Sequence, residues 1–456
     1  MPRLRSMPLA CWGNHPVVPA RAARPERRRD LDAIVGDPSI GTLISRGLGR
    51  SYGDAALPPE PREGSAAILH ERLDRLLSFE PASGMLHAEA GATLAGIIEA
   101  FLPRGFLPAV TPGTKFVTLG GAIAADVHGK NHHTEGSFGA FVHEITLLLP
   151  SGEVLRCSRA ENTDAFWATL GGMGLTGHIL SARIRLRPVQ SAFLTVRYQR
   201  ARSIYEAFDL FAGPFSTFRY SVAWIDCLSE GAALGRSVLM GGDHTPAAEV
   251  PSPQRSRLLA PNVPRGFRVP FFAPSALLNP WTIRAFNALY FNAHWTRTRT
   301  VGYDSFFYPL DHIRDWNRLY GRRGFQQFQF VLPHEFARDG MVEVLTGLAR
   351  SKRASFLAVL KTFGPSSGGV LSFPKPGWTL SLDLPHDGGL NAFLRGLDDL
   401  IVKHGGRRYL AKDACLSPGH FRRMYPELDR FREIRARLDP HDRLASALSR
   451  RLGITP

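Results

Sequence analysis

The sequence predicts an α+β fold with more than one domain, in which the later domain is built on an antiparallel sheet. At 456 residues the chain is longer than one ordinary domain. Two glycine-rich segments interrupt the strands and helices of its first part, and the pattern changes after Pro188. From there strand-like runs recur with helices between some of them, which is typical of an α+β domain.

Charge and composition limit the classes of partner. Hydrophobic residues make up 44% and charged residues 21%, as in packed globular domains. The formal net charge of +16 favours anionic partners such as phosphates or anionic lipid. The arginines are spread along the whole chain, and no zinc-finger or ribonucleoprotein motif occurs. We therefore expect no nucleic-acid partner.

Cysteine spacing and the N-terminal residues bear on location. Cys11, Cys157, Cys227 and Cys415 lie too far apart to predict a disulfide framework or a metal cluster. The N-terminus has only a broken apolar run, so no secretory signal is evident. No segment has eighteen consecutive apolar residues, the signature of a membrane-spanning helix. We expect a cytoplasmic protein or one bound peripherally to a membrane.

The first part of the chain begins with a helix from Pro25 to about Ile34 and a strand at 41–45. Further strands are expected at 65–69, 86–90 and 178–187, and helices at 93–102 and 162–170. Thr93 is the expected N-cap of the first of these helices. Ser151-Gly152 predicts a hairpin between strands at 144–150 and 153–156.

The first glycine-rich loop, residues 46–54, directly follows the strand at 41–45. A strand that leads into such a turn is the usual context of a phosphate-binding loop. Its glycine spacing differs by one residue from the Rossmann fingerprint, and Pro58 and Pro59 prevent a regular helix after it. The loop therefore predicts a pyrophosphate site outside a Rossmann fold.

The second glycine-rich segment, residues 111–139, ends in a cluster of donors and titratable groups from His128 to His133. Glycines destabilise a helix interior by about 1 kcal/mol each, so a packed helix is not expected here. Glycine also lets backbone N–H groups approach a flat or anionic ligand closely. The segment predicts a ligand cradle; the alternative is a surface loop with solvated histidines.

A literal match to G-x-G-x-x-G at Gly172, Gly174 and Gly177 has to be rejected. It follows a helix and precedes a strand, which is the reverse of the order in a dinucleotide-binding unit. We interpret it as a tight connection that passes close to a ligand.

After Pro188, strands are expected at 193–200, 218–226, 236–240, 324–332, 355–362 and 379–384, and helices at 203–211, 310–320 and 389–404. Gln327 and Gln329 would share one face of their strand, opposite Phe328 and Phe330. The phenylalanines predict the buried face, which leaves the glutamines toward a pocket or toward water.

Residues 250–303 contain no Asp or Glu. The interval carries many aromatics and seven arginines: Arg255, Arg257, Arg265, Arg268, Arg284, Arg297 and Arg299. Basic and aromatic residues without carboxylates favour contact with an anionic lipid surface. The alternative is an insertion that packs its aromatics internally.

The two glycine-rich segments together resemble the flavin domain of the vanillyl-alcohol-oxidase (PCMH) type of FAD enzymes. Within this type, the chain resembles the decaprenylphosphoryl-β-D-ribose 2-oxidase family from about residue 9 to 453. The segments that carry this resemblance are SRGLGRSYGD, PGTKFVTLGGAIAADVHGKNHHTEGSFG, FWATLGGMGLTG, GFQQFQFVLP, LSFPKPGW and YLAKDA.

The resemblance implies an FAD-binding domain of residues 1–190, completed by 407–456, and a substrate-binding domain of 191–406 with a lid-like insertion at 250–303. Arg50 stands where relatives with covalently attached FAD have a histidine, so we expect non-covalent FAD. The residues expected to bind the cofactor are Arg46, Gly47, Leu48, Gly49, Arg50, Ser51, Tyr52, Gly53, Pro112, Gly113, Thr114, Thr118, Gly120, Gly121, Ala124, Asp126, His128, Gly129, Asn131, His132, His133, Ser137, Phe138, Gly174, Gly177, Ile179 and Tyr409.

The same resemblance implies oxidation of the 2-hydroxyl of a polyprenylphosphoryl ribose to a keto sugar, which a partner NAD-dependent reductase would convert to the arabinose epimer. Trp224, Gln327, Gln329, Lys361 and Lys412 are the expected substrate residues, and Trp224 and Lys361 lie outside the six segments. Such an oxidation needs a base for the hydroxyl proton. His128 and Lys412 are the two possible bases, and Tyr52 could orient the ring or relay a proton.

Alternatives remain open at three levels: the two lysines, the activity and the class of protein. For Lys412 the alternative is a surface ion pair with Asp413, and for Lys361 an exposed position at a strand end. For the activity it is an aldonolactone or alditol oxidase acting on a soluble sugar, which would not need the basic and aromatic interval. A non-enzymatic lipid- or nucleic-acid-binding protein is the third, and a colourless purified protein would favour it.

Overall fold

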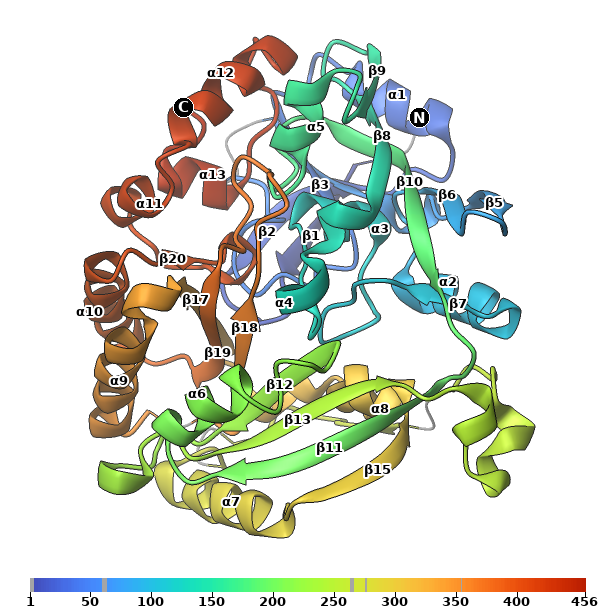
Figure 1. Cartoon of the computed structure of the whole chain (residues 1–456). Coiled ribbons are helices and arrows are strands. Elements are labelled where there is room, and N and C mark those ends of the chain that lie inside the picture. Colours follow the sequence, from blue (N-terminus) through green and yellow to red (C-terminus); the bar gives the residue numbers. More distant parts are fainter. Residues whose placement is uncertain (1–3, 60–63, 263–265, 275–276, 354) are drawn as a thin grey trace.

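The structure is a computed structural model of the whole chain, and it describes residues 4–59, 64–262, 266–274, 277–353 and 355–456. Three large sheets organise it (Figure 1). Two of them belong to the first part of the chain. The third takes its strands from the later part, and every pairing within it is antiparallel.

The first sheet has the order β1-β2-β4-β3, with β3 and β2 both parallel to β4. Its strands are β1 (Arg5–Ala10), β2 (Val17–Ala23), β3 (Thr42–Arg46) and β4 (Ser65–Leu69). The helix α1 (Arg28–Val35) buries Leu31, Ile34 and Val35, which explains the apolar spacing before β3. The first glycine-rich loop leaves the carboxyl end of β3 and forms no helix, as expected.

The second sheet has the order β5-β6-β10-β8-β9, with the short β7 also paired to β10. Its strands are β5 (Leu76–Glu80), β6 (Met85–Glu89), β7 (Phe106–Pro108), β8 (Val142–Leu148), β9 (Val154–Ser158) and β10 (His178–Pro188). Its helices are α2 (Leu94–Phe101), α3 (Leu119–Ala124), α4 (His132–Glu135) and α5 (Thr163–Thr169). Thr93 caps α2 by accepting a hydrogen bond from the Gly96 N–H, as the sequence predicted.

The second glycine-rich segment was expected to form no packed helix, and this was wrong for two short stretches, α3 and α4. Thr118 caps α3 by accepting from the Gly121 N–H. The glycines permit close packing, because a Cβ on Gly120 would lie 2.9 Å from the Cβ of Ala90. The helix is therefore short and pressed against the strand β6.

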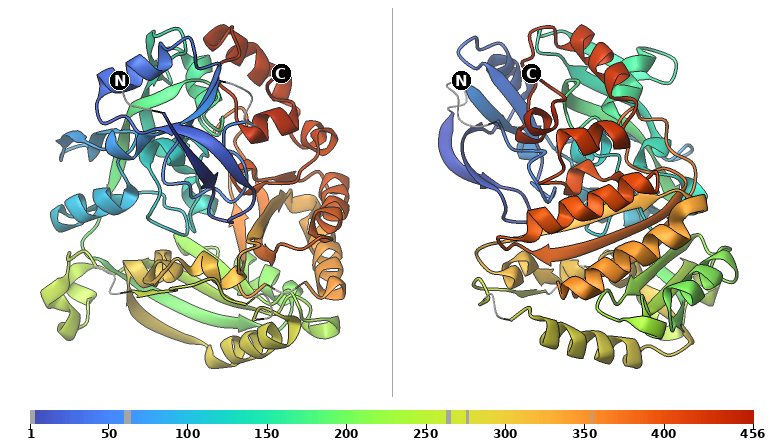
Figure 2. Two further views of the ribbon diagram at one scale, coloured as in Figure 1. Left: turned by 180° about the vertical axis from the view of Figure 1, so that it is seen from behind. Right: turned by 90° about the vertical axis from the view of Figure 1, so that its left-hand side faces the viewer.

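The third sheet has eight strands in the order β15-β11-β13-β12-β18-β19-β17-β20. These are β11 (Phe193–Ala201), β12 (Tyr220–Ile225), β13 (Ser237–His244), β15 (Arg297–Gly302), β17 (Phe325–Leu332), β18 (Ala358–Phe363), β19 (Gly377–Pro385) and β20 (Arg407–Arg408). The accompanying helices are α6 (Ile204–Ala212), α7 (Pro280–Ala293), α8 (Tyr303–Phe307), α9 (His334–Ser351) and α10 (Leu390–Lys403). Figure 2 shows α9 and α10 lying across this sheet.

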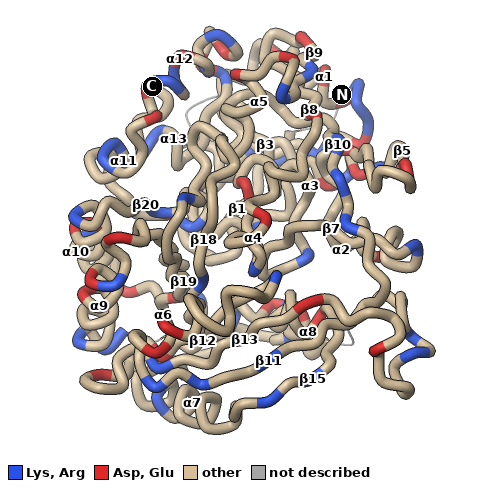
Figure 3. Tube along the Cα trace, viewed as in Figure 1, with Lys and Arg blue, Asp and Glu red and all other residues tan. Residues whose placement is uncertain are grey.

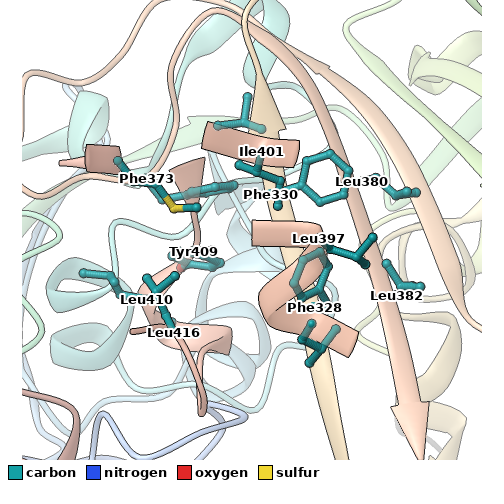
Figure 4. Packing of buried hydrophobic residues seen from close by; sticks show 14 of the residues in the cluster. Phe328, Phe330, Phe373, Leu380, Leu382, Leu397, Ile401, Tyr409, Leu410 and Leu416 are labelled. Carbon is teal, nitrogen blue, oxygen red and sulfur yellow. The ribbon is translucent and has the colours of Figure 1, made fainter. Parts of the chain in front are cut away.

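The core of this part forms between β17, β19 and α10. Every residue of β17 is buried, and the aromatic rings of Phe328 and Phe330 pack among Leu380, Leu397 and other apolar side chains (Figure 4). This leaves Gln327 and Gln329 on the opposite face of β17, as the alternation in the sequence predicted.

The prediction of one helix at 310–320 is wrong. The structure has 3-10 turns at Pro309–His312 and Trp316–Tyr320, separated by the two-residue strand β16 (Ile313–Arg314). Asp315 has a φ of 54°, a left-handed conformation that a continuous right-handed helix cannot contain. β16 instead pairs in parallel with β14 (Phe267–Arg268).

The acidic-free interval 250–303 ends in the edge strand β15 and contains α7, while its residues 263–265, with Arg265, and 275–276 lie outside the described residues. The alternative that its aromatics pack internally does not hold for Trp281, Phe267 and Phe271, whose exposed fractions are 78%, 70% and 68%. Figure 3 shows Lys and Arg spread over the molecule and no acidic residue along α7.

The later residues return to the first sheet. They form α11 (Pro418–Met424), α12 (Leu428–Leu438) and α13 (Ala447–Leu452), and Leu444 bridges to Leu43 of β3. Arg451 donates hydrogen bonds to Asp54 (2.7 Å) and to Asp413 (2.8 Å). This pair of contacts ties the end of the first glycine-rich loop to the segment that carries Lys412.

Candidate functional site

One large cavity is lined by both glycine-rich segments and by residues of all three large sheets. Its volume of about 380 Å³ falls within the range of ligand sites in proteins. The predicted site residues that line it are Arg46, Gly47, Leu48, Gly49, Arg50, Ser51, Tyr52, Pro112, Gly113, Thr114, Thr118, Gly120, Gly121, Ala124, His128, Gly129, Gly174, Gly177, Ile179, Tyr409, Trp224, Gln327, Gln329, Lys361 and Lys412. The sequence prediction that the two segments share one ligand site thus agrees with the geometry.

Seven predicted cofactor residues do not line this cavity: Gly53, Asp126, Asn131, His132, His133, Ser137 and Phe138. Asp126 accepts hydrogen bonds from the Ser137 hydroxyl and the Gly139 N–H.

The remaining members of this group also have structural partners. Asn131 donates to the Ala109 carbonyl, and His133 bonds the Phe218 carbonyl. Gly53 packs so closely that a Cβ would lie 1.6 Å from the Asp413 carbonyl oxygen. The geometry therefore supports structural positions for this group, and not direct contact with a ligand.

The two glycine-rich segments touch each other at the floor of the cavity. A Cβ on Gly47 would lie 2.2 Å from the Thr118 hydroxyl oxygen, so only glycine fits there. Gly49 has a φ of 63°, in the left-handed region that glycine favours. The backbone N–H groups of residues 48–51 have no hydrogen-bond partner within the described residues. Such unpaired N–H groups in a glycine loop suit an anionic ligand such as a pyrophosphate.

A buried polar network lies where β17 meets the second glycine-rich segment. Gln329 donates through its amide nitrogen to Nε2 of His128 (2.9 Å) and to the hydroxyl of Thr379 (2.9 Å). His128 therefore carries its proton on Nδ1. This Nδ1 and the Oε1 atoms of Gln327 and Gln329 are buried without a partner in the described part of the chain. Unpaired buried polar atoms on cavity-lining residues indicate that a polar ligand completes them.

Three half-buried lysines, Lys130, Lys361 and Lys412, line the same cavity. Burial lowers the pKa of Lys130 to about 7 and that of Lys361 to about 8. Burial and the charge of Lys361 lower the pKa of Lys412, while the nearby Asp383 opposes this shift. A cluster of cations inside a cavity favours an anionic ligand.

The imidazole of His128 is a weak base in this environment. Burial lowers its pKa well below the usual value, and the charges of Lys361 and Lys412 lower it further. The imidazole is therefore neutral and acts as a hydrogen-bonding group. Of the two bases that the sequence offered, Lys412 fits proton removal near neutral pH better than His128 does.

The predicted alternative for Lys412, a surface ion pair with Asp413, is wrong. Asp413 is fully buried and pairs with Arg408 and Arg451, whereas Lys412 donates to the Ser381 hydroxyl (3.2 Å). The Tyr52 N–H donates to the Ala411 carbonyl (2.9 Å), and the Lys412 amine lies 5.7 Å from the centre of the Tyr52 ring. Burial raises the pKa of Tyr52, so its hydroxyl stays protonated.

The structure also adds cavity residues that the sequence prediction missed. Lys130 was within reach, since it stands inside the donor-rich stretch 128–133. Trp12 gave no signal, yet the Arg50 guanidinium lies 4.0 Å from the centre of its ring. Tyr290 of α7 packs on Trp224 at 4.6 Å between ring centres, so the acidic-free interval reaches the cavity.

Comparison with known proteins agrees with this geometry. The model of the FAD binding domain family matches residues 19–158, and that of the D-arabinono-1,4-lactone oxidase family matches residues 384–452. A decaprenylphosphoryl-β-D-ribose oxidase of Mycolicibacterium smegmatis is 38% identical over 413 residues, which cover 90% of this chain and 89% of that protein. The chain belongs to the decaprenylphosphoryl-β-D-ribose oxidase family.

Two further relatives show how wide the similarity is. An uncharacterised protein of Streptomyces coelicolor is 35% identical over 373 residues, which span 79% of this chain and all of that protein. Cytokinin dehydrogenase 7 of rice is 28% identical over 232 residues, which span 51% of this chain and 43% of the enzyme. This decaprenylphosphoryl-β-D-ribose oxidase family member is an FAD-dependent oxidoreductase of the α+β, two-domain PCMH type.

The residues present fit FAD. The close-packed glycines and unpaired N–H groups of the first loop suit its pyrophosphate, and the orphaned polar atoms of His128 and Gln329 suit a heteroaromatic ring or a sugar. The loop 46–54 contains no histidine, and Arg50 stands where covalent attachment of FAD would need one. No helix among the described residues is both long and apolar enough to cross a membrane.

Proposed function

We propose that the protein oxidises the 2-hydroxyl of a polyprenylphosphoryl-β-D-ribose to the 2-keto sugar, using non-covalently bound FAD. The observation that carries this proposal is the set of three lysines in one cavity that also contains the glycine-lined floor. A neutral sugar offers no charge to cationic lysines, whereas a sugar phosphate diester supplies negative charge to Lys361 and Lys130 and leaves Lys412 free to be neutral.

The positions of the side chains give each group of cavity residues a role in binding. The first loop and the second segment would hold the cofactor, and Gln327, Gln329 and Tyr52 would orient the sugar hydroxyls. Lys361 and Lys130 would bind the phosphate. When bound, FAD supplies a hydride acceptor.

Lys412 is the base in this proposal. The lowered pKa of its amine gives a neutral fraction near pH 7, and a neutral amine can accept the hydroxyl proton. The neutral imidazole of His128 would hold Gln329 in place and offer its Nδ1–H to the ligand. Trp224, packed on Tyr290, would cover the sugar on its apolar side.

The test is anaerobic mixing of the purified yellow protein with polyprenylphosphoryl ribose. The flavin absorption band is expected to bleach with this substrate and not with ribose or ribose 5-phosphate. Equal bleaching by a free sugar would reject the lipid-linked substrate. Acid precipitation should release FAD into the supernatant, whereas a coloured pellet would contradict the non-covalent assignment.

A soluble aldonolactone is the second candidate substrate, because the D-arabinono-1,4-lactone oxidase model matches residues 384–452. The same anaerobic experiment separates the two. Bleaching by D-arabinono-1,4-lactone, with none by the lipid-linked ribose, would favour the lactone oxidase.

The keto sugar implies a second enzyme. We propose an NAD-dependent reductase as partner, since reduction of the carbonyl from the opposite face returns the arabinose epimer. Adding such a reductase with NADH to the oxidation mixture should convert the product to polyprenylphosphoryl arabinose, detectable by chromatographic separation of arabinose from ribose after hydrolysis.

We propose that the acidic-free interval meets the membrane that contains the lipid-linked substrate. Trp281 and Leu289 of α7 are 78% and 72% exposed, and Arg284 and Arg268 lie in the same interval. Aromatic and basic residues together favour an anionic bilayer surface. Replacing Trp281 and Leu289 by serine should reduce co-sedimentation with phosphatidylglycerol vesicles. Phe336→Ser, at an exposed position of α9, is the matched control, and equal losses in both variants would reject this surface.

A further inference from the structure

Ser45 lies between two histidines that no step proposed above uses. Its hydroxyl is 3.0 Å from Nε2 of His70 and 2.7 Å from Nδ1 of His178. Ser45 and His70 stand at the carboxyl ends of the adjacent parallel strands β3 and β4, and His178 begins β10 directly after Gly177. Three separate elements thus bring one serine and two imidazoles together beside the first glycine-rich loop.

The two histidines are buried and Ser45 is half-buried, yet the trio reaches the cavity. His70 and His178 are 4% and 0% exposed, and Ser45 and His70 line the cavity. Burial lowers the pKa of His70 to about 4 and that of His178, with help from His70 and Arg443, to about 3. Both rings are therefore neutral at physiological pH, and each carries one N–H and one acceptor nitrogen.

The outer ring nitrogens of the two histidines lack hydrogen-bond partners among the described residues. The serine hydroxyl accepts from one ring and donates to the other, so one outer ring nitrogen is an N–H and the other an acceptor. These outer atoms, Nδ1 of His70 and Nε2 of His178, are buried without a partner in the described part of the chain. An unmade hydrogen bond of this kind is costly, and His70 is the member that lines the cavity.

The position of the trio indicates which part of the cofactor lies beside it. It stands on strands of the first two sheets, next to the loop suited to the pyrophosphate. The residues proposed for sugar and proton, Lys412, Gln329 and Lys361, stand on or beside the eight-stranded sheet. None of the hydrogen bonds of the trio reaches those residues. The reactive ring must meet the sugar, so the opposite part of the cofactor lies toward the trio.

We propose that Nδ1 of His70, oriented by Ser45 and His178, is a further cofactor-binding group that hydrogen-bonds the ADP part of FAD. A neutral imidazole suits this part because either tautomer can serve it: the N–H pairs with a phosphate or ribose oxygen, and the bare nitrogen accepts from a ribose hydroxyl or the adenine amine. Which tautomer His70 adopts follows from which of the two rings the serine hydroxyl donates to. The inference depends on FAD binding alone and not on the sugar substrate.

Two substitutions of His70 separate this role from a structural one. Asn places a polar atom where Nδ1 stands, and Gln places one where Nε2 stands. The proposal predicts that His70→Asn keeps FAD affinity close to that of the wild type, while His70→Gln loses about three- to tenfold, as expected for one net hydrogen bond. The measurement is the FAD released on dilution of the purified holoenzyme, followed by flavin fluorescence. The reverse order of the two variants would show that only the bond to Ser45 matters and would overturn the proposal.

A matched control exists on the same strand as His178. Ser181 bonds Nε2 of His87 (3.0 Å), and neither residue lines the cavity. Ser45→Ala should weaken FAD binding about threefold because His70 loses its orienting partner, whereas Ser181→Ala should leave it unchanged. Equal weakening in both serine variants would overturn the proposal, since both would then act through the sheet.

Displacement of FAD from the holoenzyme by fragments identifies the part that is bound. In His70→Gln the concentration of ADP needed for displacement should stay the same, because ADP and FAD lose the same contact, while that of FMN should fall by the factor by which FAD affinity falls. A lower concentration for ADP with no change for FMN would overturn the assignment to ADP. Because no sugar is present, this outcome is independent of whether the proposed substrate is right.

Discussion

The two ends of the cavity are built by different means. At the cofactor end the backbone supplies the contacts, through glycines that allow no side chain and through unpaired N–H groups of residues 48–51. At the substrate end side chains supply them, with three lysines and a pair of glutamines brought from segments far apart in the sequence. A backbone site depends on local sequence, whereas a side-chain site depends on how whole sheets meet. This difference predicts that substitutions at the two ends will fail in different ways.

The largest effect is expected at the substrate end. Lys412→Ala should keep FAD but slow its reduction by substrate by about 10²- to 10⁴-fold, the usual contribution of a positioned base. Stopped-flow absorbance at the flavin band measures this. Lys412→Arg keeps the positive charge but cannot act as a base, so it should be nearly as slow. A normal rate in Lys412→Arg would assign the lysine to charge and not to proton removal.

Lys361→Met should raise the KM for the lipid-linked ribose about tenfold or more, because a charged hydrogen bond to the phosphate is lost. The pH profile sharpens this. Lys361 has a pKa of about 8 and is protonated below it, so kcat/KM of the wild type should fall as the pH rises through about 8. The variant should lack this decline. A decline of the same size in the variant would remove Lys361 from phosphate binding.

His128→Ala should retain FAD and slow flavin reduction by about 2- to 10-fold, since Gln329 loses the acceptor that fixes its amide. Reduction at the normal rate would remove His128 from the site, and a loss of hundredfold or more would restore it as the base. The neutral imidazole also predicts that the remaining rate has no titration between pH 5 and 7 that belongs to His128.

At the cofactor end, Gly120→Ala should lower the stability of the folded protein. The new methyl would lie 2.9 Å from the Cβ of Ala90, and such overpacking costs about 1–3 kcal/mol. Thermal unfolding followed by circular dichroism measures the loss. Gly396 of α10 is the control, because nothing lies within 4 Å of its Cβ position, and Gly396→Ala should be neutral or stabilising. Equal melting temperatures in the two variants would contradict the close packing of α3 on β6.

Most of the residues predicted for the cofactor line the cavity, and seven of them do not. The strand into residues 46–54 and the glycines of 111–139 are local patterns, and the structure places them on one cavity. Sequence reasoning failed where packing overrides local preference. Thr118 capped a helix in a segment expected to have none, and the left-handed Asp315 divided the helix expected at 310–320.

Other cavity residues were less accessible from sequence. Trp12 shows the limit, since a lone tryptophan gives no sign that it will face a cavity. The orphaned nitrogen of His70 could not be foreseen at all, because it depends on three elements meeting. The domain boundaries at 190 and 406 remain predictions. The short strand β20 after the second boundary pairs with β17 in the eight-stranded sheet.

The contacts of Arg451 with Asp54 and Asp413 have a consequence for biosynthesis. A ribosome releases residue 54 roughly 400 positions before residue 451, at about 5–20 residues per second. The nascent chain therefore spends tens of seconds with its glycine loop made and the partner that anchors it still missing. Because the cavity uses residues as late as Lys412 and the loop is anchored by Arg451, the site is complete only when nearly the whole polypeptide has been made.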